Sequence, residues 1–144
     1  PPGVLDLTVL TNRHQRELYY RDTPGVTFPG HLPDQELLAL YQQSDLLVMP
    51  MLDCTANNAV LESMACGTPV MVNRIGGISE YVDPGVNVIM EEKKVDEWVD
   101  KLINLHQEKA SLEQMRGKVR EWAEKFEWKV MAKAYEGVYE GDKI

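Results

Sequence analysis

Short apolar segments alternate with amphipathic segments along most of the chain. Runs rich in apolar and β-branched residues predict strands, and they occur at residues 4–10, 26–28, 46–49, 69–72 and 86–90; the run at 46–49 is unbroken. Apolar residues spaced three and four apart predict helices at residues 13–20, 35–43, 78–82, 95–107 and 110–139, the last interrupted near residue 127. Strands that alternate with helices at short spacing indicate βαβ units, so the expected fold class is α/β with a doubly wound parallel sheet.

Residues 45–69 contain the most informative order of elements. The apolar run ends at Pro50, a polar loop follows, and a short helix begins near Asn57 and stops at Gly67. The residue types that cap a helix start are Thr55, Asn57 and Asn58. A helix that starts just after a strand of an open α/β sheet presents unpaired N–H groups and the positive end of its dipole. This order therefore predicts a site for a phosphate-bearing ligand.

Two further features near this helix have both a functional and an ordinary explanation. Glu62 lies one to two turns into the helix, where a carboxylate can accept hydrogen bonds from sugar hydroxyls, although a helical Glu is more often only a solvated residue. Gly76 and Gly77 follow the next predicted strand, where glycine allows close approach of a ligand or a positive φ. A Gly-Gly pair is also a common turn.

Composition and charge narrow the class of protein. A chain of 144 residues suits one domain, expected to span residues 1–144. The formal charge of −8 argues against a nucleic-acid partner, because a phosphate backbone requires clustered cations. The two cysteines favour reduced thiols and a cytoplasmic location. No apolar stretch reaches the ~20 residues of a membrane span, and the histidines lack partners at ligand spacing, so no metal site is predicted.

Two segments resemble the signature of the retaining GT-B glycosyltransferases, the large "group 1" or family 4 class: LESMACGTPV at residues 61–70 and GGISEYV at residues 76–82. The likeness includes VTFPG at residues 26–30 and FEW at residues 126–128. It covers roughly residues 24–140, and the combination of motifs is specific.

The resemblance implies a Rossmann-like, C-terminal donor-binding domain of a two-domain enzyme. Such an enzyme moves a sugar from a nucleotide-diphosphate sugar to an acceptor hydroxyl with retention at the anomeric carbon, without a metal or other cofactor. Glu62 would bind the ribose hydroxyls, and the main chain of the loop at Gly30 would contact the base. The residues assigned to nucleotide-sugar binding are Gly30, His31, Thr55, Asn57, Asn58, Glu62, Gly76 and Gly77.

The sequence departs from the family pattern in two places. Cys54 stands where the family has the first of two spaced glutamates, so the catalytic residues are unknown and the neighbouring Asp53 is the candidate substitute. The family's first strand–helix unit, with its Arg and Lys, is not found before Val4. We therefore expect an acceptor-binding N-terminal domain outside this sequence, no transfer by this segment alone, and membrane contact only through that domain, at the inner face of the membrane.

Two other classes remain open. A non-catalytic nucleotide-sugar-binding module is suggested by Cys54, and binding created by a Cys54→Glu change would favour it. A GT-B-like nucleotide-sugar epimerase shares the fold and ligand, and product analysis would separate it because an epimerase needs no acceptor. Glycan or polysaccharide assembly is the expected setting of the transferase, which ranks first.

Overall fold

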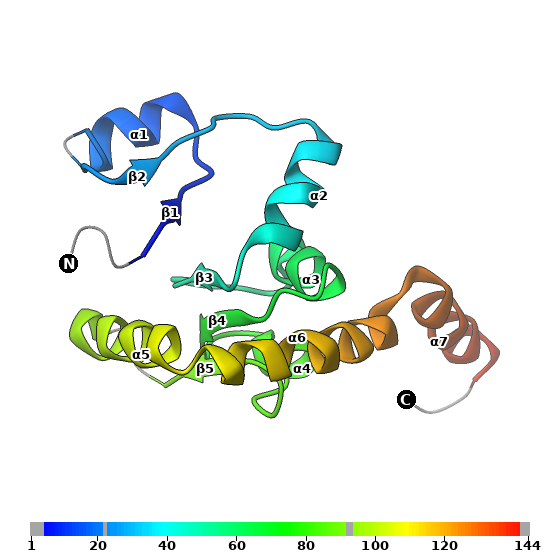
Figure 1. Cartoon of the computed structure of the whole chain (residues 1–144). Helices are drawn as coiled ribbons and strands as arrows, with labels where there is room; N and C mark the ends of the chain where they lie inside the picture. The colour runs from blue at the N-terminus through cyan, green and yellow to red at the C-terminus, as the bar shows by residue number, and fades with distance from the viewer. Residues whose placement is uncertain (1–4, 22, 92–93, 142–144) are drawn as a thin grey trace. The chain divides into compact units, whose positions relative to one another are not determined.

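The computed structural model describes residues 5–21, 23–91 and 94–141 (Figure 1). The chain divides into two compact units, Pro1–Leu40 and Tyr41–Ile144. The prediction of one donor-binding domain over residues 1–144 stays a prediction about function.

The first unit contains a small parallel sheet. Strand β1 (Leu7–Thr8) pairs with β2 (Val26–Thr27), and helix α1 (Arg13–Tyr19) connects them. The Asn12 side chain caps α1 by accepting the backbone N–H of Gln15 at 2.9 Å. Both strands are shorter than the predicted runs 4–10 and 26–28, and residue 4 lies outside the described residues. Helix α2 (Asp34–Gln43) leads from this unit into the second.

The second unit is built on a parallel sheet of three strands in the order β3 (Leu47–Met49), β4 (Val70–Asn73) and β5 (Val88–Met90). The register pairs Val48 with Met71 and Val72 with Ile89. Helices connect the strands: α3 (Asn58–Ala65) between β3 and β4, and the short α4 (Ile78–Tyr81) between β4 and β5. These are the predicted βαβ units.

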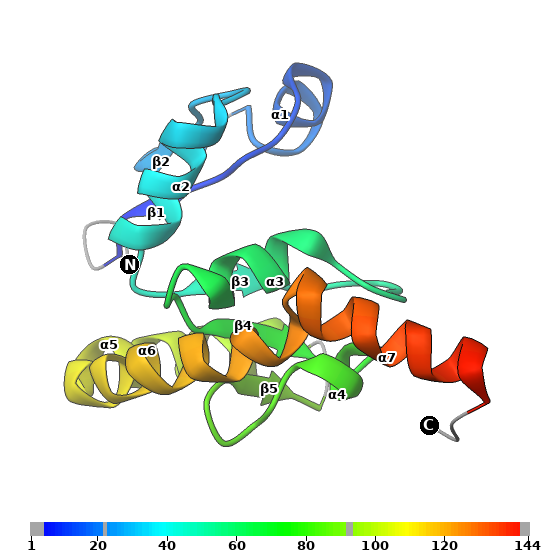
Figure 2. The same ribbon diagram turned by 90° about the vertical axis from the view of Figure 1, so that its right-hand side faces the viewer.

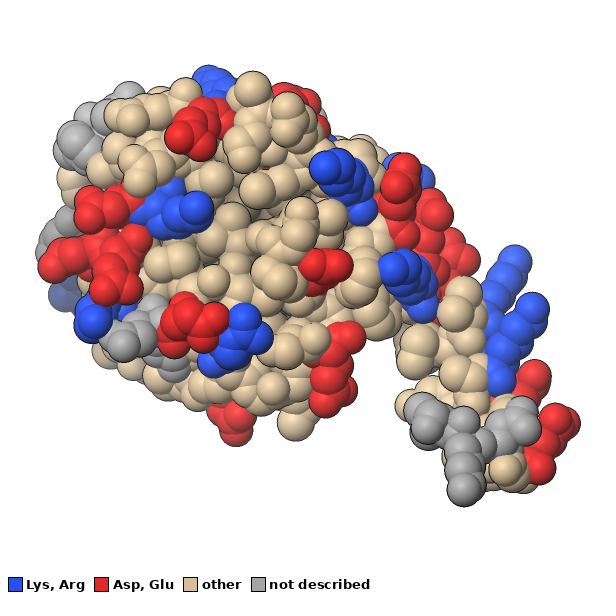
Figure 3. Space-filling model, turned by 90° about the horizontal axis from the view of Figure 1, so that it is seen from below, with Lys and Arg blue, Asp and Glu red and all other residues tan. Residues whose placement is uncertain are grey.

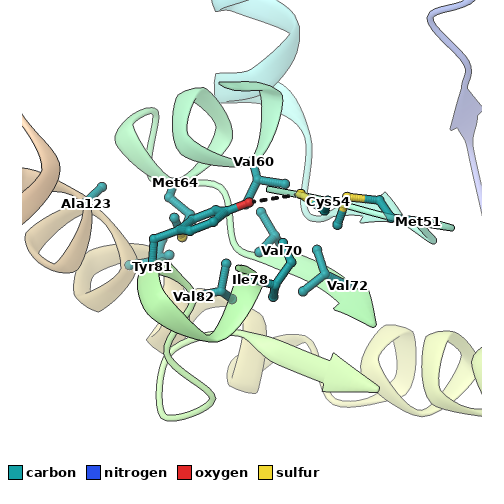
Figure 4. Close-up of a cluster of buried hydrophobic side chains, with 11 residues drawn as sticks. Met51, Cys54, Val60, Met64, Val70, Val72, Ile78, Tyr81, Val82 and Ala123 are labelled. Atoms are coloured by element: carbon teal, nitrogen blue, oxygen red, sulfur yellow. Dashed lines mark hydrogen bonds between the residues drawn. The ribbon is translucent and has the colours of Figure 1, made fainter. Parts of the chain in front are cut away.

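Both faces of this sheet are covered. Val70 and Val72 point into a buried cluster that includes residues from α3, α4 and the end of α6 (Figure 4). Met71, one residue between them, lies in a second cluster with Trp98 of α5 (Val95–Gln107) and Leu112 of α6 (Lys109–Ala123). Alternate residues of one strand therefore pack in two cores, which explains why residues 70–72 of β4 are all apolar. Figures 1 and 2 both show α5 and α6 next to one another alongside the sheet.

The ends of several elements differ from the predictions for local reasons. Strand β5 begins at Val88 rather than residue 86, because the N–H groups of Val86 and Asn87 both bond to the Asp83 carbonyl in a turn. The predicted interruption near residue 127 is confirmed. A 3₁₀ turn, η1 (Glu124–Phe126), ends at Glu127, whose extended backbone (ψ 143°) separates α6 from α7 (Trp128–Glu140).

The surface carries charges of both signs. On the face drawn in Figure 3, Asp and Glu side chains lie among Lys and Arg side chains. Among the described residues, no helix is long and apolar enough to pass through a bilayer.

Candidate functional site

The loop after β3 is fixed to the end of β4 at the carboxyl edge of the sheet. Asn73, the last residue of β4, accepts the Met51 N–H at 2.7 Å through Oδ1 and donates through Nδ2 to the Met51 carbonyl at 3.0 Å. Asn73 is buried away from water, so these two bonds give hydrogen-bond partners to both ends of its side-chain amide and to the Met51 N–H and carbonyl. The carboxyl edge of a parallel α/β sheet is where such folds bind ligands.

Gly76 and Gly77 touch the same loop from the other side. The Gly77 N–H donates to the Cys54 carbonyl at 3.0 Å. A Cβ atom on Gly76, whose φ is +51°, would lie 1.7 Å from the Cys54 carbonyl oxygen, and one on Gly77 would lie 2.4 Å from that of Thr55. The close approach that requires glycine is therefore an approach to the loop backbone. Ligand contact by this pair stays a prediction.

The hydroxyl of Tyr81, on α4, contacts two residues of the loop. Its hydroxyl accepts the Asn57 backbone N–H at 3.1 Å and lies 3.4 Å from the Cys54 Sγ (Figure 4). Burial raises the pKa of Tyr81 above its usual value, and the contact with Cys54 raises it further, so the hydroxyl is neutral at physiological pH. Trp122 in turn donates its indole N–H to the Tyr81 carbonyl at 2.9 Å. Hydrogen bonds with Tyr81, which is itself hydrogen-bonded to Trp122, therefore fix the loop.

Asn57 is the N-cap of α3. Its Oδ1 accepts the Val60 N–H at 3.3 Å, and its own backbone N–H is bonded to Tyr81. The Asn57 backbone N–H is therefore bonded within the protein. The assignment of Asn57 and Asn58 to nucleotide-sugar binding stays a prediction. Asn58, the first residue of α3, is exposed. The first-turn N–H groups of a helix that remain outside such caps are the ones that can meet an anion.

Glu62 lies on the same face of α3 as Asn58, because residues four apart stand one above the other on a helix. Its side chain is exposed, and its Oε2 accepts the Tyr41 hydroxyl at 3.2 Å. Burial, followed by the Glu62 charge and this hydrogen bond, raises the pKa of Tyr41 to about 12. The Tyr41 hydroxyl thus keeps its proton at neutral pH and donates it to the hydrogen bond with Glu62.

Cys54 and Asp53 have opposite environments. Cys54 is buried in the cluster around Tyr81, whereas Asp53 is exposed and accepts the Cys54 backbone N–H at 2.8 Å. An open hollow at this loop is lined by Asp53, Cys54, Thr55, Ala56 and Asn57. The structure therefore brings the predicted residues of the loop together, with the carboxylate of Asp53 on its solvent side and the thiol of Cys54 bonded inward.

The other predicted residues belong to the first unit. Gly30 and His31 are exposed in the loop after β2, and Gly30 has a φ of +78°.

Sequence reasoning missed Tyr41, Asn73, Arg74 and Tyr81. Arg74, directly after β4, donates through Nε to both carboxylate oxygens of Glu91, at 2.8 and 3.0 Å, and through Nη1 to Ser79 at 3.0 Å. The polar residues that end and follow the apolar run of β4 were the available signal for Asn73 and Arg74. The two tyrosines gave none, since each occupies an ordinary core position of a helix.

Among the described residues, no group of three or more His, Cys, Asp or Glu is arranged to hold a metal ion.

The comparisons with known proteins agree on the family and the fold. The family model described as "Glycosyl transferases group 1" matches residues 5–108. A D-inositol 3-phosphate glycosyltransferase of Corynebacterium jeikeium is 30% identical over 116 residues, which are 80% of this chain and 28% of that relative. A protein of the same name from Rhodococcus opacus is 31% identical over 105 residues, which are 72% of this chain and 23% of that relative. The chain thus spans less than a third of the length of these relatives.

Solved structures show the same fold at low identity. Sucrose-phosphate synthase from Thermosynechococcus elongatus has a TM-score of 0.81 at 21% identity, covering 94% of this chain and 38% of that chain. Anabaena HepE in complex with UDP-glucose has a TM-score of 0.63 at 20% identity, covering 76% of this chain and 30% of that chain. This likeness confirms the predicted Rossmann-like α/β fold.

Proposed function

The chain belongs to the glycosyl transferases group 1 family, and from this we infer that it forms the donor-binding part of a GT-B glycosyltransferase. The donor is a nucleotide-diphosphate sugar, and the enzyme transfers the sugar to an acceptor hydroxyl with retention at the anomeric carbon. That HepE has a structure with UDP-glucose supports a nucleotide-sugar donor, and the motif at residues 61–70 supports the retaining class.

One observation carries this proposal: Asn58 and Glu62 occupy a single exposed face of α3, which begins at the carboxyl edge of the parallel sheet. The diphosphate lies at the first turn of α3, and the ribose hydroxyls lie one turn further on, at Glu62. The spacing of one helical turn, ~5.4 Å, suits a nucleotide in which the phosphate and the ribose are covalent neighbours.

The leaving group in this transfer is the nucleoside diphosphate, which gains negative charge as the bond to the sugar breaks. The backbone N–H groups of Asn58 and Ala59 and the dipole of α3 stabilise that charge, so the proposed reaction runs without a metal ion. Gly76 and Gly77 hold the loop that contains Thr55 through close backbone contacts. A base contact by the loop at Gly30 and His31 stays a prediction.

The remaining parts of the enzyme belong to the proposal as well. The acceptor binds to a further domain of a longer protein, as the coverage of the relatives supports. The setting is glycan assembly in the cytoplasm or at the inner face of the membrane, reached through that further domain. A nucleic acid is not a partner, given the formal charge of −8.

A second function is favoured by Cys54. The family position of the first glutamate holds a thiol that is buried against Tyr81, and it offers no carboxylate to the sugar. A module that binds nucleotide-sugar without catalysis fits this environment. Exposed Asp53 is the carboxylate that would have to act in its place if the protein is an enzyme.

A titration tests the donor-binding proposal. The chain is titrated with UDP, GDP and ADP and with their sugar conjugates by calorimetry, in the parent and in Glu62→Ala. We expect one nucleotide to bind saturably and Glu62→Ala to weaken it by about 1–3 kcal/mol, the cost of a lost hydrogen bond to a charged group.

Glu113→Ala is the matched control, because Glu113 is also an exposed helical glutamate but lies on α6. Its affinity should equal that of the parent. Failure of all three nucleotides to bind at millimolar concentration would refute donor binding by this chain. If a nucleotide does bind, product analysis of the full-length protein with an acceptor present would separate the transferase from the binding module, since only the transferase forms a glycoside.

A further inference from the structure

We propose that Tyr41 is a positioning residue that fixes the Glu62 carboxylate for binding of the ribose hydroxyls. The proposal rests on the nucleotide-sugar site inferred above and assigns it a residue from outside the loop and α3. Its basis is the hydrogen bond of 3.2 Å from the Tyr41 hydroxyl to the Glu62 Oε2.

Tyr41 is itself firmly held. Its side chain is buried, with 8% of its surface exposed, and its carbonyl accepts the Thr68 hydroxyl at 2.5 Å. Thr68 is fully buried, and its own carbonyl accepts the Ser63 hydroxyl at 3.0 Å. Ser63 is the residue after Glu62 on α3, so the donor and the acceptor of the Tyr41–Glu62 bond are joined by a second, buried route.

The last turn of α2 has a further anchor on α6. Arg116 donates through Nη2 to the Gln42 carbonyl and through Nη1 to the Ser44 carbonyl, both at 2.7 Å. A guanidinium that bridges two carbonyls at a helix C-terminus satisfies groups left without intrahelical partners and complements the dipole. The Tyr41 hydroxyl therefore has a defined position, and Glu62 is the side chain that adapts to it.

The hydrogen bond fixes Glu62 without consuming its binding capacity. A carboxylate has two oxygens with about four acceptor sites in all, and Tyr41 occupies one of them. Within the described part of the chain, Glu62 Oε1 forms no hydrogen bond. Without Tyr41, an exposed glutamate would populate several rotamers, and a ligand would have to select one of them.

The donor character of Tyr41 does not change at physiological pH. Burial raises the pKa of Tyr41 to about 12, so the hydroxyl stays protonated beside the carboxylate. A phenylalanine at this position would keep the ring and its packing and would remove only the donor.

A double-mutant cycle with UDP as the probe tests this role. Calorimetry is carried out on the parent, Tyr41→Phe, Glu62→Ala and the double variant, with circular dichroism to verify folding. We expect Tyr41→Phe to weaken UDP binding by about three- to tenfold in the parent, the range of one hydrogen bond. In the Glu62→Ala background the same change should alter the affinity by less than about twofold, because no carboxylate remains to position. Tyr135→Phe is the matched control, since Tyr135 is exposed on α7, and it should bind like the parent.

The other outcomes overturn the proposal in distinguishable ways. Equal losses in both backgrounds would mean that Tyr41 acts independently of Glu62, and an unchanged affinity in Tyr41→Phe would mean that it positions nothing. In either case Glu62→Ala still weakens UDP binding, so the donor site itself stands. If the parent binds no UDP, GDP or ADP, or if Glu62→Ala is without effect, the donor site fails and the role of Tyr41 fails with it.

Discussion

Gly76→Ala is the substitution whose effect the structure specifies most closely. The new Cβ would lie 1.7 Å from the Cys54 carbonyl oxygen and 2.8 Å from the Cys54 carbonyl carbon, and both are backbone atoms that no rotamer change can move aside. The φ of +51° adds the left-handed strain of an L-residue, about 1–2 kcal/mol. Displacing the loop also breaks the 3.0 Å bond from Gly77 N–H to Cys54, worth about 1 kcal/mol. We expect a loss of about 2–4 kcal/mol in the free energy of unfolding.

Substitutions at two other glycines separate the cost of the positive φ from the cost of the contact with Cys54. Gly30 has a similar positive φ of +78° and nothing within 4 Å of its Cβ position, so Gly30→Ala should show the strain alone, about 1–2 kcal/mol. Gly117 lies inside α6 with nothing within 4 Å, and Gly117→Ala should stabilise the chain by about 0.5–1 kcal/mol.

Urea denaturation followed by circular dichroism measures all three variants. The expected order of stability is Gly117→Ala, parent, Gly30→Ala and Gly76→Ala. If Gly76→Ala were as stable as Gly30→Ala, the contact with the Cys54 carbonyl would contribute nothing, and the account of how the two glycines hold the loop would be wrong.

Two further predictions concern buried tyrosines. Tyr81→Phe leaves the Asn57 N–H without its acceptor and removes the partner of Cys54, so the urea midpoint should fall by the equivalent of about 1–3 kcal/mol; a midpoint equal to that of the parent would contradict the assigned bonds. The second prediction concerns how the free energy of unfolding depends on pH through Tyr41. The pKa of Tyr41 is about 12 in the folded chain against ~10 when unfolded, so its contribution is complete below pH ~10 and is lost as the pH rises toward 12. Urea midpoints measured from pH 8 to 11.5 should fall, and less steeply in Tyr41→Phe; parallel curves would count against the shift.

The environment of Cys54 bears on the prediction that this residue stands at the position of the family's first glutamate. Restoring a carboxylate here would place a charge in a cluster with Val60 and Tyr81, where a buried charge without a partner is costly. The thiol, by contrast, packs as a small apolar group and shares a hydrogen bond with the Tyr81 hydroxyl. A thiol at this position is thus consistent with the inward direction of the side chain.

The sequence by itself determined the elements and their order, because these depend on local periodicity. The unbroken apolar run that became β4, the break near Glu127 and the cap at Asn57 were all predictable from residues within a few positions of one another. The family signature added the expectation that Glu62 faces a ligand, and the structure exposes it on α3 beside Asn58.

Only the tertiary structure decided how the loop and the carboxylate are held. The donor to Glu62 is Tyr41, 21 positions earlier, and the acceptor of the Asn57 N–H is Tyr81, 24 positions later. The need for glycine at position 76 arises from a carbonyl at Cys54, which no local pattern reveals. These contacts join segments that become neighbours only when the parallel strands align. They therefore depend on the assembly of the whole sheet and cannot be found from neighbouring residues in the sequence.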